Sequence, residues 1–219
     1  MSTYCAGCHH FHSEPQCPLC GDEFAHQTSV PLAMRSAIAA LVAELQQADE
    51  RAGRLQQRLN DAHRDASYGC LTRAGLDERY SWHQRRDTAA LGFIFFDLDG
   101  MHDLNTELGY AAVDARIRAA LAHSTRDGEC AAGRWYSGDE LVVLLEIVPG
   151  DTGVAETVAL RIADELEAVG LSATFAFGSL HGRSSWVDRP LAAIIERLSL
   201  IVQAAKVNGQ RGSIQWVGL

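Results

Sequence analysis

The 219-residue sequence lacks the long hydrophobic run that a membrane protein needs. No apolar stretch approaches the roughly 18 residues of a membrane span, and the N-terminus has no basic segment followed by an apolar one, as a signal peptide has. Internal repeats and low-complexity tracts are also missing. We therefore expect a cytoplasmic protein with no membrane partner.

An excess of basic residues is missing as well. The net charge is −9, which excludes the broad positive surface that binds duplex nucleic acid. A composition of 47% hydrophobic and 21% charged residues is typical of a folded domain. Any phosphate that the protein binds must be held locally, and we expect a metal ion to help.

The cysteines do not form the even framework of a disulfide-rich protein, because four of the six lie in the first twenty residues. The pairs Cys5-x-x-Cys8 and Cys17-x-x-Cys20 can present four sulfurs to one structural Zn²⁺. Four unrelated cysteines are the alternative. We predict a zinc ribbon over residues 1–28, which is too short to bury a core and must take its folding energy from the metal.

Residues 31–66 have the spacing of a coiled coil. Apolar residues recur in alternating steps of three and four. They are Ile38, Leu41, Leu45, Ala48, Ala52, Leu55, Leu59 and Ala62. An amphipathic helix packed on its own domain is the alternative, because half of this seam is weakly apolar. We favour a parallel helix pair that makes the protein a homodimer.

Residues 67–219 alternate between strand-like and helix-like stretches. This order predicts an α+β domain with an antiparallel central sheet and helices on one or both faces. The predicted strands are 91–98, 133–136, 141–147, 172–180 and 213–217, and the predicted helices are 111–124, 152–169 and 190–206.

Acidic side chains stand at two strand ends. Asp97 and Asp99 follow the apolar run "GFIFF", and Asp139 and Glu140 follow the turn at Gly138. If the hairpin pairs beside the first strand, the acids approach closely enough to hold Mg²⁺ against phosphate oxygens. A helix cap and an ordinary hairpin turn are the alternatives for each site alone.

Several motifs in order resemble the GGDEF domains, the diguanylate cyclases that condense two GTP molecules into cyclic di-GMP. The similar segments run from about Asp65 to Gln215. They are "DASYGCLTRAGLDERY", "FFDLDGMHDLNTELGYAAVD", "SGDEL" in the place of GGDEF, "ATFAFGSL" and "IVQAAKVNGQRG". The resemblance implies the nucleotide-cyclase, palm-like version of the α+β fold.

The resemblance also implies roles for particular residues. A Mg²⁺ or Mn²⁺ site would use Asp97, Asp139 and the backbone carbonyl of Leu98, with Glu140 as a further catalytic acid. The positions that read guanine match Asn105 and Asp114, and those near the triphosphate match His102, Lys206 and Arg211. From the residues alone, a helix N-cap or turn residue at Asn105 and a solvated helix end at Lys206 stay open.

The sequence departs from the family pattern at four positions. Ser137 replaces the first glycine of the signature, Leu141 the phenylalanine, His102 a lysine and Gln210 an arginine, with Arg211 one residue away. Two lost cations weaken the grip on the γ-phosphate. We interpret the sequence as that of a working but slow enzyme that acts as a homodimer on GTP.

A feedback motif, R-x-x-D before the signature, is absent because its positions fall on Gly128 and Ala131. Product inhibition there is not expected. One alternative function is a degenerate GGDEF domain that binds GTP or a partner as a regulator. Another places the function in the zinc ribbon as a docking site for a protein partner, with nucleic acid disfavoured by the acidic charge.

Overall fold

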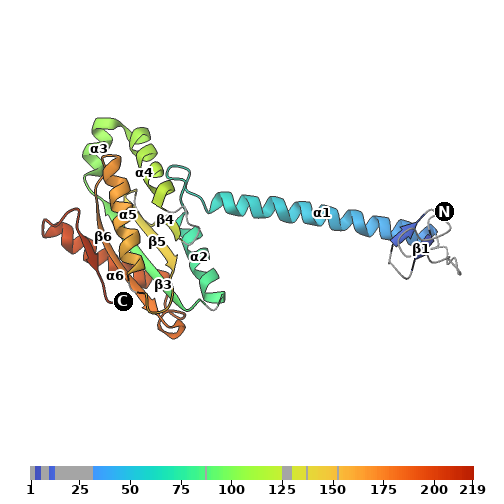
Figure 1. Ribbon diagram of the computed structural model, residues 1–219. Helices are drawn as coiled ribbons and strands as arrows, with labels where there is room; N and C mark the ends of the chain where they lie inside the picture. Colours follow the sequence, from blue (N-terminus) through green and yellow to red (C-terminus); the bar gives the residue numbers. More distant parts are fainter. Residues whose placement is uncertain are drawn as a thin grey trace. The chain divides into compact units, whose positions relative to one another are not determined.

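The computed structural model describes residues 3–5, 10–12, 32–86, 88–124, 130–136, 138–151 and 153–219. The chain forms two compact units, Met1–Arg58 and Leu59–Leu219 (Figure 1). In the first unit, β1 (Thr3–Cys5) pairs antiparallel with β2 (His10–His12). The predicted zinc ligands Cys8, Cys17 and Cys20 and the side chain of Cys5 lie outside the described residues.

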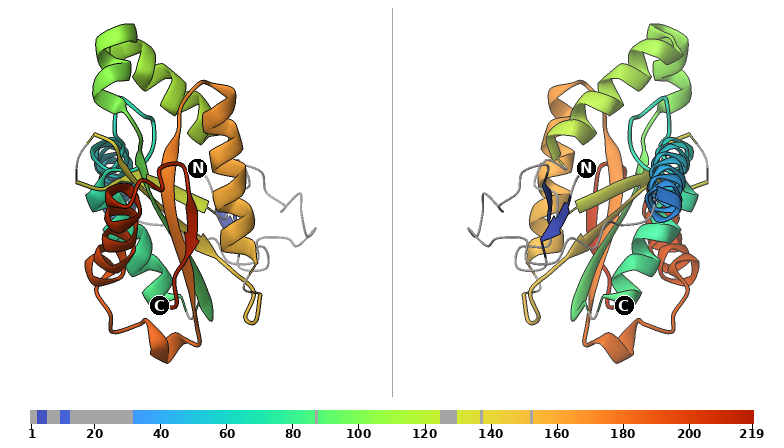
Figure 2. Two further views of the ribbon diagram at one scale, coloured as in Figure 1. Left: turned by 90° about the vertical axis from the view of Figure 1, so that its left-hand side faces the viewer. Right: turned by 90° about the vertical axis from the view of Figure 1, so that its right-hand side faces the viewer.

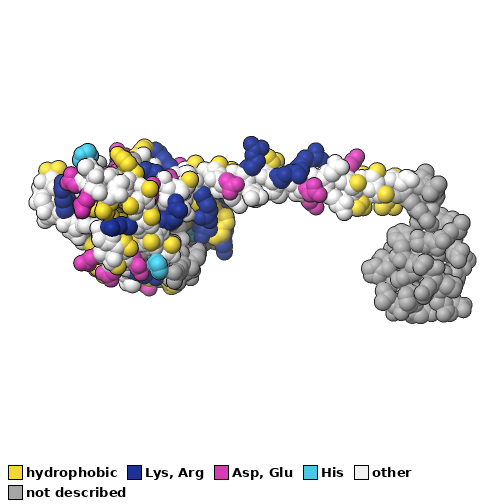
Figure 3. Space-filling model, turned by 90° about the horizontal axis from the view of Figure 1, so that it is seen from above, with side chains coloured by type: hydrophobic (Ala, Val, Ile, Leu, Met, Phe, Trp, Pro, Cys, Tyr) yellow, Lys and Arg dark blue, Asp and Glu magenta, His cyan; other side chains and the backbone are white. Residues whose placement is uncertain are grey.

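The helix α1 (Leu32–Ala62) covers most of the segment in which the sequence predicts a coiled coil. Its large seam side chains are exposed within one chain: Leu45 and Leu55 are 65% and 63% exposed. Figure 3 shows such hydrophobic side chains on the surface of the helix. None of the described helices is long and apolar enough to cross a membrane.

The second unit is built on a five-stranded sheet in the order β4-β5-β3-β6-β7. The strands are β3 (Ala90–Leu98), β4 (Cys130–Arg134), β5 (Glu140–Glu146), β6 (Ala173–His181) and β7 (Ile214–Trp216). All neighbours are antiparallel except β6 and β7, which are parallel. Gly178 permits this close pairing, because a Cβ there would lie 2.5 Å from the carbonyl oxygen of Val217.

Helices cover both faces of this sheet (Figure 2). They are α2 (Arg73–Arg85), α3 (Met101–Leu108), α4 (Tyr110–Ser124), α5 (Val154–Ala168) and α6 (Leu191–Val207), with a short 3₁₀ turn at Arg183–Ser185. One core lies between the sheet and α4 and α5 and contains Ile94 and Phe96. The other lies under α2 and α6 and contains Phe93 and Phe95.

The central strand β3 is apolar because both of its faces are buried. Its polar residues begin only where the helices no longer cover the sheet. The α+β fold predicted from the sequence is confirmed. The three predicted helices differ from the observed ones by one or two residues at their ends. The first hairpin strand was placed wrongly by two to three residues: β4 begins at Cys130 and ends at Arg134, where its pairing with β5 ends.

The buried His83 makes the stability of this unit depend on pH. Its side chain is 1% exposed, and Nδ1 lies 3.2 Å from Thr88 Oγ1. Burial lowers the pKa of His83 to about 4, and the charges of Arg79 and Arg86 act in the same direction. Glu146 lies 3.8 Å from Nδ1, but it is half-exposed and water screens its charge.

We expect the unit to lose stability as the pH falls from about 6.5 to about 4, because only the unfolded chain then binds a proton at this histidine. The loss attributable to His83 should reach at most about 3 kcal/mol. Urea unfolding across this range measures it, with His83→Gln as the comparison. The variant should lose less stability than the wild type over the same range, and equal losses would contradict the assignment.

Candidate functional site

The acids predicted at the two strand ends lie together at the end of β3. Asp97 on β3 is directly opposite Glu140 on β5, so the two side chains leave the sheet on the same face, with Cβ atoms about 4.5–5.5 Å apart. Asp139 is one residue further out, and its carbonyl oxygen accepts a hydrogen bond of 3.0 Å from the amide of Leu98. The hairpin thus pairs beside β3 as the sequence analysis required.

Asp97 is in an environment that disfavours its negative charge. Burial raises the pKa of its carboxyl above the usual range, Lys206 acts in the opposite direction, and the charges of Asp139 and Glu140 raise it again. Among the described residues, Asp97 Oδ1 and Glu140 Oε2 are buried and have no aligned hydrogen-bond partner. A cation at this end of the sheet stabilises the ionised acids.

Lys206, near the end of α6, provides one such cation. Its ammonium lies 2.9 Å from Asp97 Oδ1, 2.9 Å from Asp99 Oδ1 and 3.1 Å from the carbonyl oxygen of Leu98. The contact with Asp97 is an ion pair that lacks hydrogen-bond alignment. The lysine side chain is 19% exposed, so it is not the solvated helix end that the sequence left open.

Asp99 connects three parts of this site. Its carboxylate accepts hydrogen bonds from Thr174 Oγ1 at 3.1 Å, from Ser172 Oγ at 3.3 Å and from the amide of Gly212 at 3.1 Å. It does not cap α3, because the capping residue there is Gly100. Asp99 therefore fixes the loop after α6 to the ends of β3 and β6, a role that sequence reasoning missed.

A cavity of about 410 Å³ opens beside these acids. Its lining includes Asn105 from α3, Asp114 from α4 and Asp139 from the hairpin. Gly109 has a φ of +81°, and this left-handed turn joins α3 to α4 and brings Asn105 and Asp114 to one cavity. Asn105 Oδ1 is buried and has no hydrogen-bond partner among the described residues, so its amide is available to a ligand.

A brace of three side chains that sequence analysis missed supports the hairpin turn. The Tyr68 hydroxyl donates to the carbonyl oxygen of Gly138, and the Arg134 guanidinium lies 4.8 Å from the Tyr68 ring. Arg134 also forms an ion pair of 3.1 Å with Asp65. Burial raises the pKa of Tyr68 to about 12, and the charges of Asp114 and Asp139 contribute despite the opposing charge of Arg134. Tyr68 therefore stays protonated and can donate.

The positions that depart from the family pattern have separate surroundings. Leu141 is fully buried in the core. His102 is exposed on α3 and does not line the cavity. Gln210 accepts a hydrogen bond from Gln215, and Arg211 is exposed. Ser137 lies outside the described residues. Neither His102 nor Arg211 lines the cavity that contains Asn105 and Asp114, and their predicted contact with a triphosphate stays a prediction.

The donor atoms at the end of β3 suit a hard cation. Carboxylate and carbonyl oxygens are the ligands that Mg²⁺ and Mn²⁺ prefer, and two carboxylate oxygens here have no aligned hydrogen-bond partner in the described part of the chain. No group of three or more His, Cys, Asp or Glu side chains that could hold a metal occurs among the described residues. The residues therefore fit a site of two carboxylates and one carbonyl that takes its other ligands from phosphate and water.

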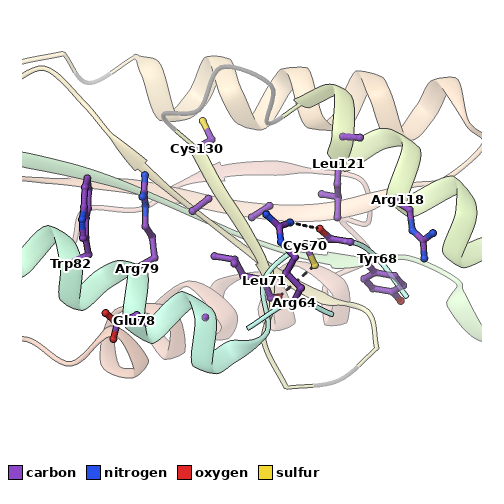
Figure 4. A pocket seen from close by; sticks show the side chains of 15 residues that line it. Arg64, Tyr68, Cys70, Leu71, Glu78, Arg79, Trp82, Arg118, Leu121 and Cys130 are labelled. Carbon is purple, nitrogen blue, oxygen red and sulfur yellow. Dashed lines mark hydrogen bonds between the residues drawn. The ribbon is translucent and has the colours of Figure 1, made fainter. Parts of the chain in front are cut away.

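A second cavity, of about 700 Å³, lies between α2, α4 and β4 (Figure 4). Ala131, which stands at one of the two positions where the feedback motif would have its charged residues, lines this cavity, and Gly128, at the other, lies outside the described residues. Arg118 donates to the carbonyl oxygens of Ala66 and Ser67, and Arg79 stacks at 4.4 Å on Trp82. Both arginines thus already make contacts within the chain. The absence of product inhibition stays a prediction.

No protein-family model matches the sequence, and a search of curated proteins gives no match. Solved structures match the fold. The diguanylate cyclase SiaD of Pseudomonas aeruginosa, in complex with its activator SiaC, is 18% identical, with a TM-score of 0.55 over 85% of this chain and 76% of that one.

Two further neighbours are GGDEF domains by name. The coiled coil and GGDEF domain of DgcB from Caulobacter crescentus, in complex with c-di-GMP, is 17% identical, with a TM-score of 0.61 over 84% of this chain and 100% of that one. The GGDEF domain of YfiN from Pseudomonas aeruginosa is 24% identical, with a TM-score of 0.55 over 69% and 99%. The fold of this chain is that of GGDEF domains.

Proposed function

We propose that the chain is a diguanylate cyclase that condenses two GTP molecules into cyclic di-GMP across a homodimer. The observation that carries this proposal is that Asn105, Asp114 and Asp139 line one cavity. A pair of polar side chains that could read a base thus lies beside acids that could hold a metal ion.

The cavity suits guanine. The Asp114 carboxylate can accept hydrogen bonds from guanine N1–H and N2–H₂, which adenine cannot supply in the same arrangement. Asn105 has both a donor and an acceptor, and its buried Oδ1 gains the partner that it lacks among the described residues. Leaving such groups unpaired with the wrong base costs affinity, so GTP is favoured over ATP.

With the base in the cavity, the triphosphate would extend toward the end of β3. A Mg²⁺ or Mn²⁺ ion held by Asp97, Asp139 and the Leu98 carbonyl would lower the pKa of the attacking 3′-hydroxyl and neutralise the phosphates. The 3′-oxygen of one GTP bonds to the α-phosphorus of the other, and pyrophosphate leaves. Glu140 would accept the hydroxyl proton, and its buried Oε2, which has no hydrogen-bond partner in the described residues, supports this role.

Each subunit holds one GTP, so the reaction needs two facing subunits. The exposed apolar seam of α1 has no cover within the described chain, and a second copy would bury it. The coupled helices bring the two sites together and set the angle at which they face each other. The zinc ribbon would be the input module, a dimerisation clamp or the docking site of a protein partner.

We expect a double substitution, Leu45→Glu with Leu55→Glu, to convert a dimer into a monomer of 23.8 kDa, because the charges face each other across the seam. Light scattering measures the mass. Gln57→Glu, on the outer face of the same helix, is the matched control and should stay dimeric. An unchanged mass for the double variant would show that α1 is not the dimer contact.

The proposal is tested by incubating the pure protein with GTP and Mg²⁺ and separating the products by chromatography. Cyclic di-GMP and pyrophosphate are expected. The second candidate function is a GTP-binding regulator without turnover. The presence of His102 and Gln210 where the family pattern has a lysine and an arginine favours it, since fewer cations then meet the triphosphate. GTP binding without product would support this alternative.

A further inference from the structure

The chain contains one lysine. Of its 19 basic residues, 18 are arginines, and the lysine is Lys206. Lysine differs from arginine in having a compact charge on a flexible stem with three donors, whereas the planar guanidinium suits two-pronged contacts. The ammonium lies within 3.1 Å of three oxygens, those of Asp97, Asp99 and the Leu98 carbonyl.

Two of these three oxygens belong to the groups to which the proposed function assigns the metal ion. They are Asp97 Oδ1 and the carbonyl oxygen of Leu98, 2.9 Å and 3.1 Å from the ammonium nitrogen. An ammonium and a divalent cation cannot share these positions, because like charges at contact distance repel each other strongly. Lys206, which the resemblance assigns to the triphosphate, thus contacts two of the proposed metal ligands in the absence of nucleotide.

We propose that Lys206 is a built-in counter-ion that occupies the cation position on Asp97 and Leu98 before nucleotide binds, and that the metal ion must displace it. On displacement the ammonium moves from Asp97 to the triphosphate. Binding of metal and binding of nucleotide are then coupled, because the phosphates give the Lys206 ammonium a new anionic partner in place of Asp97.

Asp99 is the positioning residue of this exchange. It forms the third contact of the ammonium, at 2.9 Å, and is itself fixed by Ser172, Thr174 and the Gly212 amide. It is only 9% exposed. Asp99 is not needed as a metal ligand, so it can keep the lysine near the phosphates after Asp97 releases it.

This inference rests on the proposed function, but metal without nucleotide tests it. We expect Lys206→Met to bind Mn²⁺ at least about tenfold more tightly than the wild type, because the competing charge is gone while Asp97 and Leu98 stay. Electron paramagnetic resonance of free Mn²⁺, with no nucleotide present, measures the affinity. Arg197→Met is the matched control: it removes one exposed positive charge from the same helix, about 13 Å away along its axis, and should bind Mn²⁺ as the wild type does.

The unmodified protein provides a second test, which does not depend on the folding of a variant. Because Lys206 is the only lysine, acetylation by acetic anhydride can be followed on one peptide by mass spectrometry. Mg²⁺ alone should raise the acetylation rate of Lys206 above that in NaCl of equal ionic strength. Adding GTP with Mg²⁺ should lower it again, as the ammonium contacts phosphate.

The proposal is overturned if Lys206→Met binds Mn²⁺ no more tightly than the wild type, or if Mg²⁺ leaves the acetylation rate of Lys206 unchanged. Failure of the proposed function has a different signature. The chain would then show the exchange with metal alone, but GTP would change neither the acetylation rate nor the melting temperature.

Discussion

Asp139→Asn should lower the formation of cyclic di-GMP by at least about a hundredfold, the scale on which the loss of one charge partner of a transition state acts. The substitution barely changes the side-chain volume, and the backbone carbonyl of Asp139 still accepts from the Leu98 amide. The fold should therefore persist, and the defect should lie in metal and phosphate binding.

Thermal melts with and without GTP and Mg²⁺ separate these effects. Wild type should gain stability from the ligand, and Asp139→Asn should gain much less. Asp103→Asn is the matched control, since Asp103 is an exposed acid on α3 that does not line the cavity. If Asp139→Asn keeps both the activity and the ligand-induced shift, the acids form only a surface turn and the cyclase proposal is wrong.

The sequence predicts the sheet well where burial controls the pattern. β3 is apolar on both faces, and β5 and β6 flank it, so each reads as a run of buried residues. The parallel pairing of β7 was not predicted. This pairing depends on α6, which returns the chain across the sheet, and on the close approach of Val217 to Gly178. The sequence of the short strand β7 alone reveals neither.

The helices α2 and α3 were missed for different reasons. α2 has a visible signal, because Thr72 caps its N-terminus and Leu76, Tyr80 and His83 are buried at helical spacing. α3 has only eight residues and no fully buried side chain, so its periodicity carries little information. Short helices at the rim of a cavity are held by their neighbours rather than by an apolar face of their own.

The predicted acids are adjacent in sequence to the strand ends that position them, which is why local patterns locate them. The anchoring role of Asp99 and the brace of Tyr68, Arg134 and Asp65 could not be found in this way. Asp99 binds Thr174 and Gly212, 75 and 113 residues away, and Tyr68 reaches Gly138 across 70 residues. Their partners are set by the pairing of the strands.

The guanine cavity gives the second large expected effect. Asp114→Ala should weaken GTP binding by roughly 10- to 100-fold, because guanine N1–H and N2–H₂ lose a charged acceptor, whose hydrogen bonds contribute about 1.5–3 kcal/mol. Asp114→Asn keeps an acceptor but adds a donor, so part of the recognition should remain. Because Asp114 is only half-buried and α4 takes its packing from other residues such as Val113 and Ile117, neither change should unfold the domain.

Titration with fluorescent GTP and ATP analogues in the presence of Mg²⁺ measures this effect. The ratio of the two affinities is the informative quantity. Loss of guanine recognition lowers the affinity for GTP, whereas the affinity for ATP, which Asp114 cannot recognise, stays unchanged. Glu107→Ala, which removes an exposed acid from α3 outside the cavity, controls for the change in net charge. Equal GTP affinity for wild type and Asp114→Ala would show that Asp114 does not contact the base, and the cavity would then need another occupant.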